Sequence, residues 1–183
     1  MLNASEQDGV FLEGKLPLSW VAASGFDAGQ LERWMHANAA LLRALAVLDS
    51  SAAETERDAP TPAGKAIERL EAKTDLTLAL VIQLLGQQTV LPPAHATILR
   101  ADSIEWLTEQ PPSDGGTIAV SLYLSPKLPL PLVLPASVTT VAGTPAGTRV
   151  RARLSGLDED VQDWLERTLF RHHRRAVQKM HGA

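Results

Sequence analysis

Two adjacent polar residues, Asp102 and Ser103, stand in the stretch "ADSIEW" that runs from Ala101 to Trp106. The stretch lies between the apolar run "ATIL" and the turn-rich "TEQPPSDGGT", where one predicted strand gives way to the next. A carboxylate and a hydroxyl at this place can bind a ligand, or they can shape a bend. The first alternative predicts a protein that senses a small molecule. The second predicts a protein that only holds other proteins together.

A second polar cluster, "RHHRR", lies near the end of the last predicted helix. Its arginines, Arg171, Arg174 and Arg175, can bind phosphates through charged hydrogen bonds. The explanation that we favour is that these cations stabilise the negative C-terminal end of the helix. His172 and His173 point about 100° apart on a helix, so they cannot hold one metal ion from a single face.

Patterns of catalysis are missing from the sequence. It contains no GxSxG, HExxH, P-loop or GxGxxG pattern, no cysteine, and no acidic residue at a suggestive spacing from a histidine. We therefore expect no enzyme, no metal site and no cofactor. The formal net charge of -4 provides no overall positive field for nucleic acid.

The composition is that of a folded protein, because 45% of the 183 residues are hydrophobic. The N-terminus, "MLNASEQDGV", has neither the basic nor the apolar region of a signal peptide. The longest apolar-rich run, Leu76 to Leu85, is far shorter than the ~20 residues that span a bilayer. We expect a cytoplasmic protein.

The N-terminal half has a helical pattern after one short strand. "KLPLSWVAA" predicts a strand at a sheet edge, because Pro17 cannot donate a ladder hydrogen bond. A helix over about 27–49 follows, with Asp27 as its N-cap. After a polar loop, a second helix is predicted over about 61–88, and Pro92 and Pro93 cannot continue it.

From residue 89 onward, short strands separated by turns predict a small antiparallel barrel or sandwich. The clearest strand is "TRVRARLSG", in which Arg149, Arg151 and Arg153 face away from the apolar positions between them. A final helix from about Asp158 to Met180 has a mostly apolar stripe that should pack on the strands. The stripe consists of Val161, Trp164, Leu165, Thr168 and Leu169.

The helix over 61–88 has the strongest local pattern. Its positions alternate in spacings of three and four, which is the heptad register of a coiled-coil seam: Ile67, Leu70, Thr74, Thr77, Val81, Leu84 and Gln88. Further apolar residues surround the segment from Leu76 to Leu85, so more of its surface needs covering than one barrel can cover. We expect these seven residues to form an oligomer interface. The alternative is that the helix packs inside one subunit.

The C-terminal half is similar to the PilZ domain, a six-stranded barrel closed by a C-terminal helix. "TRVRARL", the link "LSGLDED" and the helix start "VQDWLERTLF" carry most of this similarity, which covers roughly residues 89–177. The resemblance implies an α+β fold, a PilZ-like six-stranded antiparallel β-barrel with a C-terminal helix, to which the chain adds an N-terminal pair of long helices. We expect an N-terminal strand plus helical oligomerisation region over 1–88, and the barrel with its closing helix over 89–183.

Ordinary PilZ domains bind cyclic di-GMP through RxxxR before the barrel and [D/N]xSxxG on the following strand. "ADSIEW" falls at the second motif: Ser103 matches the serine, whereas Ala101 and Trp106 replace the polar residue and the glycine. "GQQTVLPPAH", before the barrel, contains no arginine, and the RxxxR of Arg171 and Arg175 lies on the closing helix. We expect no binding by the usual motifs. In ordinary members two arginines bind the phosphates, and the small glycine lets the backbone approach the ligand. Trp106 would fill that space, so we expect "ADSIEW" to be a strand junction with a degenerate site and Trp106 to belong to the core or to an interface.

The helical half resembles an atypical branch of this family, found in plant-pathogenic bacteria with type IV pili. In that branch, added long helices, one with heptads, assemble the protein into a tetramer. The resemblance implies a homo-oligomer, a tetramer, that regulates or scaffolds cyclic di-GMP-linked processes such as pilus biogenesis, motility or virulence, with protein partners in the pilus or signalling machinery. The alternative is a genuine cyclic di-GMP receptor with a displaced arginine site, for which Ser103, Arg171, Arg174 and Arg175 are the candidates. The mixed residues of the heptad seam do not fix the number of subunits.

Overall fold

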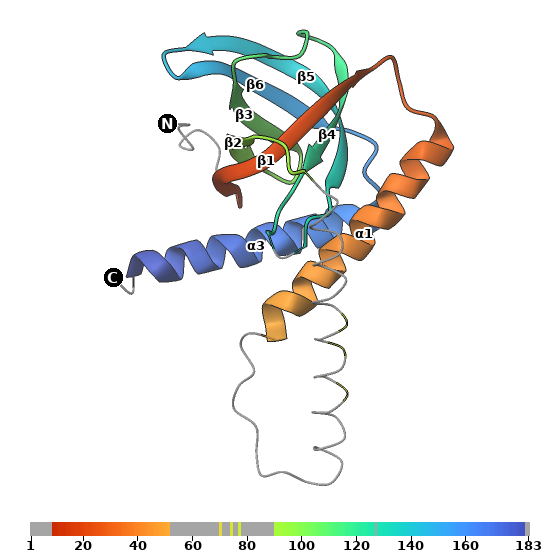
Figure 1. Cartoon of the computed structure of the whole chain (residues 1–183), viewed down its shortest axis with the longest axis vertical. Coiled ribbons are helices and arrows are strands. Elements are labelled where there is room, and N and C mark those ends of the chain that lie inside the picture. The colour runs from red at the N-terminus through yellow and green to blue at the C-terminus, as the bar shows by residue number, and fades with distance from the viewer. Residues whose placement is uncertain are drawn as a thin grey trace, which may run out of the picture.

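The described part of the chain folds as a closed β-barrel with two long helices beneath it (Figure 1). The computed structural model describes residues 9–51, 70, 74, 77, 90–126 and 128–181, except for the side chains of residues 49–51 and 175–181. The barrel strands are β1 (Leu12–Ala23), β2 (Ala94–Leu99), β3 (Ser103–Thr108), β4 (Thr117–Leu122), β5 (Leu132–Thr144) and β6 (Gly147–Leu154). They are antiparallel, and their order around the barrel is β1-β2-β3-β6-β5-β4.

The first strand, β1, closes the barrel, so the expectation of an edge strand is wrong. Its first half pairs with β2 as far as Pro17, and its second half pairs with β4 from Leu18 onward. Proline is tolerated because β1 changes its partner at this point, and the Pro17 carbonyl accepts a hydrogen bond from the Tyr123 amide at 3.0 Å. The barrel therefore takes one of its six strands from the region before residue 88.

Alternating side chains fill the barrel, as expected for strands with one buried face. In β6 the arginines face outward and the predicted apolar residues between them, Val150, Ala152 and Leu154, are buried. Trp106 of β3 is the largest fully buried side chain. The segment before β5 contains several prolines, and regular strand structure begins only at Leu132.

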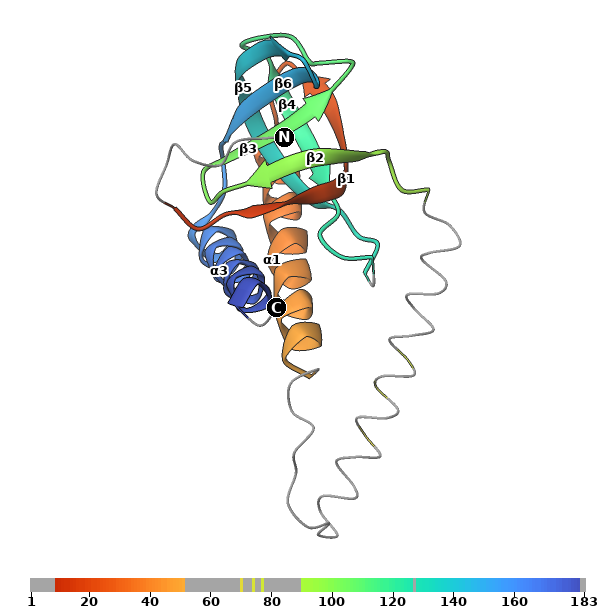
Figure 2. The same cartoon turned by 90° about the vertical axis from the view of Figure 1, so that its left-hand side faces the viewer.

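The two helices α1 (Ala28–Ser51) and α3 (Glu159–His181) lie side by side under the barrel (Figure 2). Both begin at aspartate caps: Asp27 Oδ1 accepts from the Gln30 amide at 2.8 Å, and Asp158 Oδ1 accepts from the Val161 amide at 2.8 Å. The predicted stripe of α3 is buried apart from the half-buried Trp164, but α3 packs mainly against α1 and less against the strands. The buried four are Val161, Leu165, Thr168 and Leu169.

A buried asparagine ties α1 to the barrel. Asn38 is 1% exposed, and its side-chain amide donates to the carbonyl of Val133 in β5 at 2.7 Å. The Asn38 side-chain oxygen accepts from the amide of the same Val133 at 2.9 Å. This part of β5 lies before the first residue that pairs with β6, Ala136. Asn38 therefore replaces the missing strand neighbour and satisfies both backbone groups of Val133.

The predicted second helix falls largely outside the described residues. Leu70, Thr74 and Thr77 have helical backbone, and the Thr74 hydroxyl donates to the Leu70 carbonyl at 2.9 Å. All three side chains are exposed, and Leu70 is 65% exposed. The other seam residues, Ile67, Val81, Leu84 and Gln88, lie outside the described residues.

Among the helices that the structure describes, none has the length and apolar character needed to cross a membrane.

Candidate functional site

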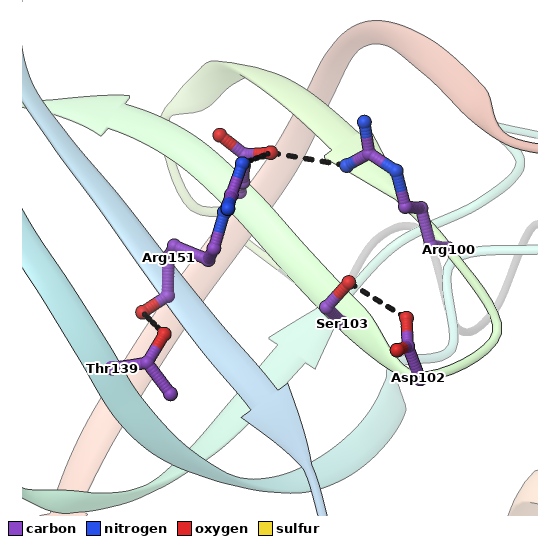
Figure 3. A network of polar contacts seen from close by, with 6 residues as sticks. Arg100, Asp102, Ser103, Thr139 and Arg151 are labelled. Carbon is purple, nitrogen blue, oxygen red and sulfur yellow. Dashed lines mark hydrogen bonds and ion pairs between the residues drawn. The ribbon is translucent and has the colours of Figure 1, made fainter. Parts of the chain in front are cut away.

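The stretch "ADSIEW" forms the turn between β2 and β3 and the first part of β3. The Arg100 amide donates to the Ser103 carbonyl at 2.8 Å, which closes the turn. The Ser103 hydroxyl donates to Asp102 Oδ1 at 2.8 Å, as Figure 3 shows, and the Asp102 carbonyl accepts from the Leu154 amide at 2.8 Å. Asp102 and Ser103 therefore shape the bend and hold it against β6.

Trp106 lies inside the barrel and not on its outer surface. It is fully buried, and its ring centroid lies 5.5 Å from that of Trp20. Ser103 and Trp106 are three positions apart in one strand, so their side chains point to opposite faces. Trp106 therefore does not fill the space of a ligand beside Ser103, and the expectation that it belongs to the core is confirmed. Its large ring contributes to the core instead.

Outside the barrel, a buried carboxylate holds two arginines beside the turn. Arg100 Nη1 and Arg151 Nη2 both donate to Glu105 Oε1 at 3.0 Å (Figure 3). The Glu105 side chain is only 5% exposed and the Arg100 side chain 12%, whereas that of Arg151 is 49% exposed. Arg100 also lies over the Phe11 ring, with its guanidinium carbon 5.8 Å from the ring centroid. These contacts fix the direction of Arg100 at the end of β2.

A cavity of about 970 Å³ separates the β2–β3 turn from α3. Its walls are residues 9 and 10, the turn residues 100–102, and α3 residues between Asp163 and Arg171. Phe170 also lines the cavity and is exposed, so its ring offers a surface on which a flat ligand can stack. The volume falls within the ~300–1,000 Å³ that is usual for small-molecule sites.

Two arginines from distant parts of the sequence, Arg100 and Arg171, line this cavity together. Arg171 Nη2 donates to the Thr168 hydroxyl at 2.9 Å, but the Nε atoms of both arginines are buried without a hydrogen-bond partner among the described residues. A buried donor without an acceptor costs stability. Two arginines whose Nε atoms have no acceptor among the described residues therefore mark a place where an anionic or carbonyl ligand would be stabilised.

The charges around the cavity balance one another. Its three arginines, Arg100, Arg167 and Arg171, face three carboxylates, Asp102, Asp163 and Glu166. Arg167 forms an ion pair with Asp163 at 2.8 Å. A ligand with phosphates would thus be held by local hydrogen bonds from Arg100 and Arg171, and not by a positive field over the whole cavity.

The candidate arginines of the last helix separate in the structure. Arg171 lines the cavity, Arg174 is exposed and does not line it, and the side chain of Arg175 lies outside the described residues. The helix-end explanation for this cluster is wrong, because α3 continues to His181 and the helix-end effect is confined to the last turn. Ser103 does not line the cavity, although its neighbour Asp102 does.

Sequence reasoning missed Arg100. The candidate arginines from the sequence were those of the last helix and of the usual motif before the barrel, whereas Arg100 follows the second strand. An arginine directly before the Ala-Asp-Ser of a predicted turn is the signal that could have found it.

Comparison with known protein families identifies the family of this barrel and its closing helix. The model of the family described as the atypical PilZ domain, cyclic di-GMP receptor, matches residues 42–181. The chain belongs to the atypical PilZ family. Among curated proteins no match is found.

A solved structure extends the likeness of this atypical PilZ protein to almost the whole chain. A pathogenic protein from Xanthomonas campestris, described as a new tetrameric PilZ domain self-assembled via an unusual helical bundle, is 27% identical. The alignment covers 93% of this chain and 91% of that chain, with a TM-score of 0.77. This atypical PilZ chain is thus similar to a tetrameric protein whose subunits assemble through a helical bundle.

Proposed function

We propose that this atypical PilZ protein is a self-associating, non-enzymatic regulator or scaffold in cyclic di-GMP signalling. The observation that carries the proposal is the match to the atypical PilZ family over residues 42–181. The likeness to a tetrameric PilZ domain supports self-association. Pilus biogenesis, motility and virulence are the processes that we propose for it, with a cytoplasmic location and with partners in the pilus or signalling machinery.

The interface that we propose is the heptad seam from Ile67 to Gln88. Leu70 is exposed in the single chain, which leaves it available to a second subunit. Each large aliphatic residue left in water forgoes ~1.5–3 kcal/mol of burial, so several per subunit are enough to favour association. We propose a tetramer.

The assembly is tested by light scattering after size exclusion. We expect wild type to form an oligomer at tens of micromolar, and Val81→Asp with Leu84→Asp to give a monomer or an aggregate. Far-ultraviolet circular dichroism of the soluble fraction checks that the strands still form. Arg33→Gln, an exposed change on α1, is the control and should leave the mass unchanged. A wild-type monomer would show that the predicted helix over 61–88 packs within one subunit.

We further propose that the protein does not bind cyclic di-GMP by the two usual motifs. The segment before β2 has no arginine, and the hydroxyl of Ser103 is used inside the turn. Trp106 contributes nothing to this argument, because it lies inside the barrel.

A second candidate function is a genuine cyclic di-GMP receptor with a displaced site. The specific observation in its favour is the cavity that brings Arg171 of the closing helix beside Arg100 of the turn. In this candidate the two guanidinium groups would bind phosphate or guanine oxygens, and Phe170 would stack on a base.

Calorimetric titration with cyclic di-GMP separates the two candidates. Arg171→Gln removes a cavity arginine, and Arg174→Gln is the matched control because it removes the same charge from an exposed position on the same helix. Micromolar or tighter binding that is lost in Arg171→Gln but kept in Arg174→Gln would establish the displaced site. Absence of binding to wild type at tens of micromolar would support the scaffold.

A further inference from the structure

The outer surface of β6 carries three arginines in a row, at alternate positions. Arg149, Arg151 and Arg153, here named the arginine row, cannot turn inward because the residues between them fill the barrel. Alternate residues of a strand lie about 6.6–6.8 Å apart, so the row extends over about 13 Å. The sequence pattern revealed the row, but neither the cavity nor the proposed assembly uses it.

The strands on both sides of the row offer it little negative charge. The residues opposite it on β3 are Leu107, Glu105 and Ser103, and those on β5 are Ala142, Thr140 and Ser137. Glu105 is the only carboxylate in this set, and it also binds Arg100. The row is therefore a positive patch on a chain whose net charge is -4.

The two outer members of the row have no ion pair among the described residues. Arg153 is exposed, whereas Arg149 is half-buried and its Nε is buried without a hydrogen-bond partner within the described part of the chain. Buried polar groups in folded proteins nearly always have hydrogen-bond partners. An acceptor that binds the Arg149 Nε would therefore be stabilised.

We propose that the arginine row docks an extended acidic segment of a partner protein, with Asp or Glu at alternate positions. An extended chain projects alternate side chains to one side at the same spacing of about 6.6–6.8 Å, so successive carboxylates can meet successive arginines. Arginine binds carboxylates through two parallel hydrogen bonds, which adds geometric selectivity. The barrel is closed in the described structure, so the partner binds through side chains and not by adding a strand.

An acidic peptide fits the row better than a nucleic acid. Nucleic-acid interfaces bury roughly 1,000–2,500 Å² of strongly positive surface, and a row of about 13 Å on an acidic chain is much smaller. The inference goes beyond the proposed function because it names the chemistry of a partner. The row does not line the cavity of Arg100 and Arg171, and its one link to the cavity among the described residues is Glu105, which Arg151 shares with Arg100.

The test is fluorescence anisotropy of the full chain with a labelled synthetic peptide of four Glu-Thr repeats. Arg149→Gln with Arg153→Gln leaves the Arg151–Glu105 ion pair in place and should weaken binding at least about tenfold, the usual range for arginine anchors of an interface. The control variant Arg33→Gln should bind within about twofold of wild type, since it lies on α1. Raising the salt concentration should weaken wild-type binding. A peptide with the same composition but four consecutive glutamates should bind more weakly.

Four results would overturn the proposal. The first is no binding of the alternating peptide, and the second is equal binding of the two peptides. The third is tighter binding of an oligothymidylate with the same arginine dependence, which would assign the row to nucleic acid. The fourth is binding of the alternating peptide that appears only in the double variant Glu6→Gln with Asp8→Gln. These two acidic residues have the same alternate spacing, so this result would mean that the chain's own acids, and not a partner, bind the row.

Discussion

Replacing Asn38 by alanine should loosen the attachment of α1 to the barrel. The substitution removes both hydrogen bonds to Val133, made at 2.7 and 2.9 Å, and leaves one backbone donor and one acceptor without partners. Each such buried group costs ~1–3 kcal/mol, and the lower part of this range applies because Val133 is only half-buried. Alanine gains back ~0.5 kcal/mol of helix propensity. The expected loss is about 2–3 kcal/mol of unfolding free energy.

Urea denaturation followed by tryptophan fluorescence measures this loss. All variants are compared at one protein concentration, because the stability of an oligomer depends on concentration. His36→Ala, an exposed change on the same helix, should stay within about 0.5 kcal/mol of wild type. If Asn38→Ala also stayed within that range, the two hydrogen bonds would not hold α1 to β5, and the reasoning would be refuted.

Three further substitutions have outcomes fixed by local contacts. Glu105→Gln should lower the free energy of unfolding, measured by urea denaturation, by about 2 kcal/mol. This is less than the ~3–5 kcal/mol of a fully buried pair, because Arg151 is half-exposed. A loss below about 0.5 kcal/mol would show that Arg100 and Arg151 do not depend on this carboxylate. Asp158→Ala removes the N-cap of α3 and should lower the free energy of unfolding by about 1 kcal/mol, seen as a drop of about 2–4 °C in Tm. An unchanged Tm would show that the Asp158 side chain does not stabilise the start of α3. Gly156→Ala should cost a similar ~1–2 kcal/mol through its φ of +66°, since the added Cβ meets only ordinary contacts; a stabilised variant would contradict the strained turn.

Local patterns in the sequence were sufficient for much of the fold. The strict alternation from Arg149 to Leu154 requires a strand with one buried face, and this is what β6 shows. Asp27 was predictable as a cap because a cap binds an amide only three residues away.

Features that join distant segments could not be predicted in the same way. Asn38 binds Val133, which is 95 residues away, and nothing around Asn38 distinguishes it from an exposed polar residue of a helix. Pro17 was read as an edge signal, but closure of the barrel gives β1 a neighbour on each side. The cavity is a third example, because Arg100 and Arg171 meet only after α3 packs below the barrel. The heptad seam stays a prediction, because four of its residues lie outside the described ones.

A native mass spectrum of wild type, recorded with cyclic di-GMP present, tests the central claim most directly because it reports assembly and bound nucleotide together. The account predicts a main species at four times 19.7 kDa that retains no nucleotide. A main species at 19.7 kDa would contradict self-association. A tetramer that retains cyclic di-GMP would contradict the scaffold and favour the receptor.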